Sequence, residues 1–266
     1  MSYFARSREI LTYRLQKFPL MNALTVKVEG DFALFTRPEF SAERVSYEVP
    51  TPSALRGLLE SIFFKPEIRW RIEKIAVLKP IRHFSTLRNE INTLQSDRAA
   101  KSWQDSGDGY FAEDDRAQRH SLCLRDVAYI IQAQIDLKPH ATDNIAKYRD
   151  QFRRRVDRGQ CFNQPYLGTR EFSAAFMPLS AQEEELVRQD RLAELAIDRS
   201  EDLGWMLFDV EFTEVSKKSK VSYYAHDASG ARVAQGSAMP KFFHAELKDG
   251  VLEVPQSLYA PIGGRS

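Results

Sequence analysis

Hydrophobic and polar residues alternate along several stretches of the chain, which is the pattern of strands that bury one face. Leu24 and Val26 begin the first stretch, and a turn or bulge is predicted at residues 29–31 before the chain continues extended to residue 36. The alternation predicts further strands at residues 70–78, 121–137 and 170–176, with a bulge near residues 125–126 where the phase changes.

Two other stretches carry apolar residues at helical spacing. The first follows a Pro-Thr-Pro-Ser segment in which Ser53 is the predicted N-cap, and it ends near Pro66. The second covers residues 143–158 and ends at Gly159 in the C′ position. The resulting order is strand, helix, two strands, helix, strand. This order predicts an α+β fold with a ferredoxin-like, RRM-type βαββαβ domain.

The chain is predicted to have three parts. Residues 1–20 mix basic and apolar residues without the continuous apolar core of a secretory signal, so we expect a poorly ordered N-terminal extension. Residues 21–180 form the ferredoxin-like domain, in which the polar stretch from about 89 to 118 is predicted as a long loop. Residues 181–266 form a small antiparallel β-rich unit, in which Asp249-Gly250 predicts a hairpin turn.

Composition excludes several classes of protein. The net charge of +1 means that any nucleic-acid surface is a local patch. No apolar run approaches membrane-spanning length, and Cys123 and Cys161 are too few and too far apart for a disulfide framework or a structural zinc site. No metal or phosphate motif occurs, so we predict no cofactor and no metal site. We expect a cytoplasmic protein without a membrane partner.

Three residues have side chains suited to cutting RNA without a metal. RNA carries its own nucleophile, because its 2′-OH attacks the neighbouring phosphate once a base removes the proton. An acid must protonate the leaving 5′-oxygen, and a cation must stabilise the phosphorane. Arg119 and His120, predicted at the start of a strand where both can reach one cleft, and Tyr47 are of the right types. They do not identify an active site by themselves, since a lone histidine is as readily structural and a lone tyrosine more often packs.

Basic residues crowd the end of the second predicted helix, opposite its apolar stripe. They are Arg149, Arg153, Arg154, Arg155 and Arg158. One interpretation is a solvated face that the helix dipole favours, and the other is phosphate contact by arginine. Glycines follow at 159 and 168, and glycine lets a backbone approach a phosphate closely, although a helix cap explains Gly159 better.

Residues 158–172, which contain Pro165-Tyr166-Leu167-Gly168, resemble a segment of the CRISPR-associated pre-crRNA endoribonucleases of type I-C (Dvulg subtype) systems, in the RAMP superfamily. Residues 35–39 and 45–57 resemble the same family, and the likeness runs from about Met21 to the C-terminus. The resemblance implies a protein that cuts the precursor CRISPR transcript at the base of the repeat hairpin. It also implies that the protein stays on the 5′ handle within the Cascade complex. The implied partners are repeat RNA and other Cascade subunits, with DNA as a further partner.

The resemblance also implies a catalytic trio of tyrosine, lysine and histidine. The tyrosine matches Tyr47 and the histidine matches His120, while Arg119 stands where the family has lysine. Arginine keeps the positive charge but does not readily donate a proton. We therefore expect His120 to act as base or acid, Tyr47 to orient the 2′-OH or assist proton transfer, and Arg119 to stabilise the phosphorane. The expected RNA-binding residues are Arg37, Arg149, Arg153, Arg154, Arg155, Arg158 and Gly168.

Two other functions fit the sequence. Related subunits of other CRISPR subtypes only hold the 5′ handle and leave cutting to another protein. An unrelated ferredoxin-like metabolic enzyme would instead have a small-molecule pocket and no affinity for RNA.

Overall fold

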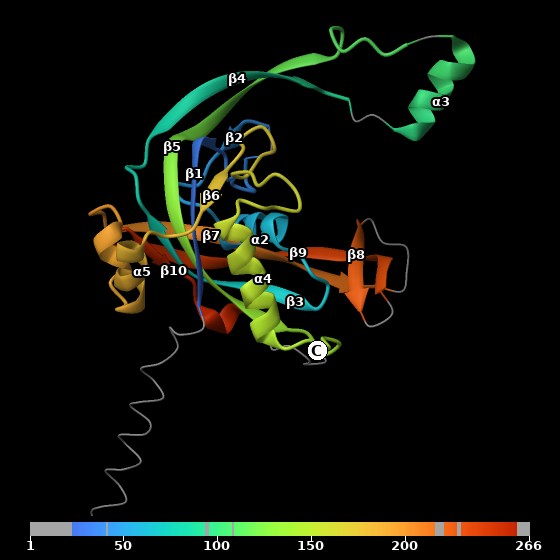
Figure 1. Cartoon of the computed structure of the whole chain (residues 1–266). Coiled ribbons are helices and arrows are strands. Elements are labelled where there is room, and N and C mark those ends of the chain that lie inside the picture. The colour runs from blue at the N-terminus through green and yellow to red at the C-terminus, as the bar shows by residue number, and fades with distance from the viewer. Residues whose placement is uncertain are drawn as a thin grey trace, which may run out of the picture.

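The protein is described by a computed structural model, which places residues 23–40, 42–93, 96–107, 109–215, 221–227 and 230–259. These residues form one large sheet with helices on both faces, so the predicted α+β class is confirmed (Figure 1). The predicted N-terminal extension lies outside the described residues. Among the residues that are described, no helix combines the length and the apolar character needed to cross a membrane.

The sheet has ten strands. They are β1 (Leu24–Ala33), β2 (Arg44–Val45), β3 (Ile68–Val77), β4 (His83–Ile91), β5 (Arg116–Leu137), β6 (Ala175–Met177), β7 (Glu201–Glu214), β8 (Val221–Asp227), β9 (Gly230–Lys248) and β10 (Val251–Glu253). The hydrogen-bonded order is β6-β1-β5-β3-β10-β9-β7, while β2 and β4 pair with β5 and β8 pairs with β9. Only the β2–β5 pair is parallel among these. Because β10 pairs with β3, the strands after residue 181 continue the same sheet, and the domain division at that point stays a prediction.

Helices cover the two faces of the sheet separately. They are α2 (Pro52–Ile62), α3 (Asp97–Ser106), α4 (Ile145–Asp157) and α5 (Ala181–Arg188), with short 3-10 turns at Leu192–Leu195 (η2) and Gln256–Leu258 (η3). α2 and α4 bury their apolar stripes against one face, where the rings of Trp70 and Phe152 lie 4.8 Å apart. Val187 of α5 and Leu192 pack on the other face, against Ala76 and Ile130.

The helix ends follow local chemistry. α4 ends as predicted, because Gly159 adopts a left-handed φ of 60°, which glycine tolerates without strain. The N-cap of α2 is Thr51 and not Ser53, since the Thr51 hydroxyl accepts the hydrogen bond from the Ala54 amide. Both residues are common caps, and the choice between them depends on where the chain leaves the extended conformation.

The stretch 89–118, predicted as a long loop or insertion, contains the helix α3 and joins the two strands of a hairpin, β4 and β5. β4 and the first part of β5 form an arm that leaves the body of the protein, and α3 lies near its far end (Figure 1). We use "arm" for β4, α3 and residues 116–124. Along β4 exposed and half-buried residues alternate, and none is fully buried. The sequence prediction missed α3 and the strand β4, because the arm leaves the body and so lacks the apolar periodicity that marks an element packed on a core.

Two local predictions concern the central strands. The turn or bulge predicted at 29–31 is wrong, because β1 runs through these residues and pairs with β5 in one register on both sides of them. Gly30 is needed for packing there, since a Cβ would lie 2.6 Å from Leu167 Cδ1. The irregularity predicted near 125–126 is confirmed: Asp126 has a φ of 53°, and its carboxylate lies 2.7 Å from Lys79 Nζ.

Gly168 lies where the loop after α4 crosses the end of β1. Its φ is 87°, and a Cβ at this position would lie 2.0 Å from the carbonyl oxygen of Leu34. The amide of Leu34 donates to the carbonyl of Leu167 at 3.0 Å, so the two backbones are in direct contact. This close approach explains the glycine without invoking a ligand.

We expect Gly168→Ala to lower the free energy of unfolding by about 3 kcal/mol, from the left-handed backbone and the overlap with Leu34 together. Gly159→Ala is the matched control, because its φ of 60° is also left-handed while no atom lies within 4 Å of its Cβ position. The control should lose only about 1 kcal/mol. Equal losses in chemical denaturation would show that the contact with Leu34 is not the cause.

Candidate functional site

Tyr47 lies in the core and not on the surface. Its exposed fraction is 0%, and its hydroxyl accepts a hydrogen bond from the amide of Leu207 in β7 at 3.2 Å. Burial raises the pKa of this hydroxyl, so it is neutral near pH 7. Arg37 covers the ring, with its guanidinium carbon 4.4 Å from the ring centroid. The side chain therefore has no surface with which to touch a ribose.

Arg119 and His120 lie within β5 and face opposite sides of the arm. His120 is opposite Leu87 and is exposed, with its Nδ1 3.4 Å from the Ser85 hydroxyl. Arg119 is opposite Arg88 and is half-buried, with its Nε 3.9 Å from Glu90. The prediction that both reach one cleft from a strand start was wrong, because β5 begins at Arg116 and side chains alternate inside a strand.

The predicted trio is therefore spread over three places. Within the described part of the chain, no hydrogen bond or ring contact joins Tyr47 to Arg119 or His120. Of the three, only His120 combines an exposed side chain with a group that can both accept and donate a proton in acid–base catalysis.

Arg37, predicted to bind RNA, is occupied within the protein. Its guanidinium pairs with Glu48 at 2.9 Å and with Glu39 at 3.6 Å, and it covers the ring of Tyr47. Two carboxylates neutralise its charge, so a phosphate would have to compete with both.

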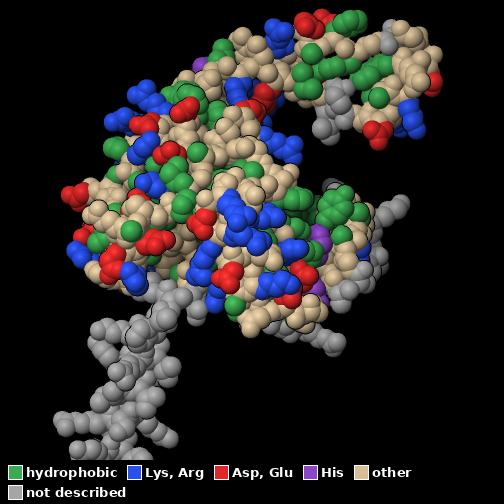
Figure 2. All heavy atoms as spheres, in the orientation of Figure 1, with side chains coloured by type: hydrophobic (Ala, Val, Ile, Leu, Met, Phe, Trp, Pro, Cys, Tyr) green, Lys and Arg blue, Asp and Glu red, His purple; other side chains and the backbone are tan. Residues whose placement is uncertain are grey.

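The arginines of α4 divide into two groups. Arg154 and Arg158 are exposed, and their side chains make no hydrogen bond or ion pair with another described residue. Figure 2 shows a group of basic side chains at the centre of the molecule, where Figure 1 places α4. These two arginines can reach a ligand without first breaking an internal contact.

The other three arginines of α4 are engaged or partly buried. Arg155 Nη1 donates to the carbonyl of Ile62 at 2.6 Å, and its guanidinium carbon lies 5.4 Å from the ring centroid of Phe63. It therefore caps the C-terminus of α2, where unpaired carbonyls carry the negative end of the helix dipole. Arg153 pairs with Asp150 at 3.5 Å. Arg149 is half-buried, and burial and then the charge of Arg153 lower its pKa.

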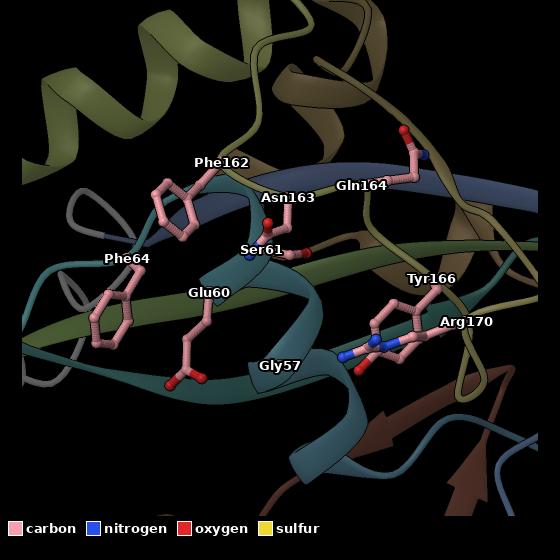
Figure 3. Close-up of a pocket in the computed structure, with 9 residues that line it drawn as sticks. All are labelled: Gly57, Glu60, Ser61, Phe64, Phe162, Asn163, Gln164, Tyr166 and Arg170. Carbon is pink, nitrogen blue, oxygen red and sulfur yellow. The ribbon is translucent and has the colours of Figure 1, made fainter. Parts of the chain in front are cut away.

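A cleft opens between α2 and the loop that follows α4. It has a volume of about 560 Å³, within the range of ligand sites. Its lining residues are Gly57, Glu60, Ser61, Phe64, Phe162, Asn163, Gln164, Tyr166 and Arg170 (Figure 3). A smaller hollow of about 230 Å³ adjoins it and shares Gly57 and Tyr166.

The sequence analysis did not select these cleft residues. Five of them lie in the stretch 158–172 that carries the family resemblance, but that resemblance predicts no role for their side chains. Gly57 is the sequence feature from which the cleft could have been predicted, because glycine is unfavourable inside a helix and its presence there needs an explanation. Its position opposite the apolar stripe of α2 would have pointed to this face.

In the described part of the chain, no group of three or more His, Cys, Asp or Glu side chains is arranged to hold a metal ion.

Comparison with known proteins gives consistent matches. A family model described as "CRISPR-associated protein (Cas_Cas5)" matches residues 23–255. A curated protein from Thermus thermophilus, named "CRISPR pre-crRNA endoribonuclease Cas5d", is 45% identical over 239 residues, covering 90% of this chain and 94% of the relative. A protein of the same name from Mannheimia succiniciproducens is 40% identical, covering 89% and 96% of the two chains.

A solved structure described as "Crystal Structure of CRISPR-associated Protein" is also similar. Its TM-score is 0.54 at 21% identity, and the match covers 88% of this chain and 91% of the other. At this identity the likeness bears on the fold alone.

We expect Arg155→Ala to lower the free energy of unfolding by about 1–2 kcal/mol, because the last carbonyls of α2 lose a charged donor. Arg154→Ala is the matched control one residue away, and it should change the unfolding free energy by less than about 0.5 kcal/mol. If Arg154 contacts a phosphate, as predicted from the sequence, Arg154→Ala should also weaken RNA binding and flatten its salt dependence. The assignment of roles is wrong if the two variants unfold at the same denaturant concentration.

Proposed function

Because this chain belongs to the Cas5 family of CRISPR-associated proteins, in its Cas5d branch, we propose that it is an endoribonuclease that processes precursor CRISPR RNA. The observation that carries the proposal is the 40–45% identity to two proteins of that name over about nine-tenths of the chain. Identity this high over nearly the whole length favours a shared reaction over a shared scaffold only.

The proposed reaction needs no metal, because the substrate supplies its own nucleophile. A base removes the proton of the 2′-OH, and the oxygen attacks the adjacent phosphorus. The bond from phosphorus to the 5′-oxygen breaks, and an acid protonates that oxygen as it leaves. The products are a 2′,3′-cyclic phosphate and a 5′-hydroxyl, and the protein takes up and returns one proton in balance.

His120 is the proposed proton-transfer residue. Its exposed side chain and its contact with Ser85 support this role, since an imidazole can both accept and donate a proton. Arg119 is the proposed phosphate-binding cation on the opposite face of the strand from His120, where Arg88 is its cross-strand neighbour. We assign Tyr47 a positioning role, because its buried hydroxyl connects the segment before α2 to β7.

The core that carries these residues is proposed to be ferredoxin-like. The strand order β6-β1-β5-β3, with α2 between β1 and β3 and α4 between β5 and β6, supports this assignment. In this order the two helices cover one face of the sheet, as in RNA-recognition modules.

We further propose that the protein stays on the 5′ handle as a subunit of Cascade. The arm supports this, because it leaves the body and exposes large apolar side chains. They are Leu87 and Ile91 of β4 and Leu122 of β5. Exposed apolar groups on a projecting hairpin are typical of contacts with a partner chain. Binding of DNA stays a prediction.

A second candidate function is a subunit that holds the 5′ handle without cutting. The observation that favours it is the separation of Tyr47, Arg119 and His120 over three places. The two functions share RNA binding and differ only in cleavage.

We expect purified protein to cut repeat RNA in the presence of EDTA, and to leave uncut the same RNA with a 2′-deoxy group before the scissile phosphate, because the nucleophile is missing. His120→Ala should slow single-turnover cleavage of the all-ribose RNA by about 100-fold or more. His244→Ala is the matched control, since His244 is also exposed and lies 3.4 Å from Asp202 on β7. Cutting of the deoxy substrate would exclude the mechanism, and binding without cutting of either RNA would favour the handle-binding subunit.

Tyr47→Phe should separate a positioning role from a catalytic one. Loss of the bond to Leu207 is expected to cost about 1 kcal/mol of unfolding free energy. Because the hydroxyl is buried, the cleavage rate should stay within about threefold of the wild type and keep its pH profile, whereas loss of a proton-transfer group costs about 100-fold or more. A loss of that size with unchanged stability would return Tyr47 to the catalytic centre.

A further inference from the structure

Gly57 is the residue that neither the fold nor the proposed chemistry explains. It lies inside α2 with helical backbone, where glycine is among the least favourable residues. A Cβ built at this position meets no atom within 4 Å, so packing does not exclude a side chain. The absence of a side chain keeps the floor of the cleft open, and the adjoining hollow opens over the same residue.

Aromatic rings form the two sides of this cleft. Figure 3 shows Phe64 and Phe162 on one side and Tyr166 with Arg170 on the other, with Gly57 between them. Phe162 is 68% exposed, and Phe64 and Tyr166 are about 40% exposed. Contact of exposed rings with water is unfavourable, so a flat apolar group that covers them would gain binding free energy.

The cleft is held in shape by backbone hydrogen bonds. The amides of Phe162 and Asn163 both donate to the carbonyl of Ser61, at 2.8 and 3.0 Å. The amide of Ala174 donates to the carbonyl of Pro165 at 2.9 Å, which closes the other end of the loop. A ligand would therefore meet rings whose backbone is already fixed, and it would not have to order the loop.

Polar groups in the cleft are available to a ligand. Neither the amide side chain of Asn163 nor the guanidinium of Arg170 makes a hydrogen bond or ion pair with another described residue. The carboxylate of Glu60 is partly neutralised, because Arg56 lies 3.1 Å from it. The exposed Arg154 and Arg158 immediately precede the loop that carries Phe162. The chemistry is that of a flat heteroaromatic group with an attached phosphate.

We propose that the cleft over Gly57 holds one unpaired nucleotide of the bound RNA, with its base between the aromatic rings and its phosphate on Arg170. This inference rests on the proposed function, which supplies RNA as the ligand. Stacking of bases on aromatic side chains is the common way in which proteins hold unpaired nucleotides. The amide of Asn163 is placed to contact an edge of the base.

Gly57→Phe should fill the cleft while leaving the fold intact, because its Cβ position is open. The probe is a repeat RNA made uncleavable by a 2′-deoxy group, and a set of the same RNA with one abasic position each. The filled variant should bind the intact RNA about 10–100-fold more weakly, and Gly57→Ala within about threefold of the wild type. For the wild type, one RNA of the abasic set should bind as weakly as the intact RNA binds to Gly57→Phe. The same abasic RNA should bind to Gly57→Phe no more weakly than the intact RNA does.

Phe162→Ala provides a second route if Gly57→Phe unfolds, since an exposed ring can be removed without a cavity. It should show the same dependence on one abasic position. Tyr224→Ala is the matched control, because Tyr224 is 76% exposed on β8 and does not line this cleft. The inference would be overturned if Gly57→Phe and Phe162→Ala bound every RNA as tightly as the wild type does. It would also be overturned if these variants bound RNA normally and lost only the binding of a protein partner.

The failure of this inference can be told apart from failure of the proposed function. If the wild type cuts RNA and the cleft variants bind normally, only the cleft assignment is wrong. If the wild type never cuts RNA, but one abasic position and Gly57→Phe weaken binding by the same amount without adding to each other, the cleft assignment holds and the proposed nuclease activity is wrong. If the wild type does not bind the RNA at all, both are wrong.

Discussion

The double role of β5 is the constraint on which the rest of the structure depends. Its second half is buried between β1 and β3 as a central strand, and its first half pairs with β4 in the arm. Asp126 lies near the junction of the two halves, where it has a left-handed φ and forms an ion pair with Lys79. Because one strand serves both parts, the twist of the buried sheet fixes where the arm leaves the body and which way its faces point.

This constraint also decides how the candidate chemistry is arranged. A continuous strand sends adjacent side chains to opposite faces, so Arg119 and His120 cannot act side by side on one atom of the substrate. Tyr47 is on neither face, since it is buried against β7. An RNA that used all of these regions would have to follow the arm on both faces, which suits a flexible single strand better than a rigid duplex.

The elements predicted correctly from the sequence are those that bury one face against the core, because burial produces a regular spacing of hydrophobic residues. The strand at 70–78 and the helix ending at Gly159 pack against the core, and their periodicity shows it. The arm lacks that signal because it leaves the core. For the same reason the predicted start of β5 was wrong, and so was the prediction that the side chains of Arg119 and His120 reach one cleft. The burial of Tyr47 depends on Leu207, 160 residues away, and no local pattern contains that contact.

The loop after α4 has a consequence for how binding preference can change. Main-chain hydrogen bonds from Phe162 and Asn163, and the backbone contact at Gly168, set its path. Of its exposed side chains, Gln164 also holds the loop, by donating to the carbonyl of Ala174. By contrast, the side chains of Phe162 and Asn163 make no hydrogen bond with another described residue. Natural variation or laboratory selection could therefore exchange Phe162 and Asn163 and so alter what the surface binds, while any change in loop length would break the main-chain contacts. The path of the loop can therefore be kept while the binding preference of its surface changes.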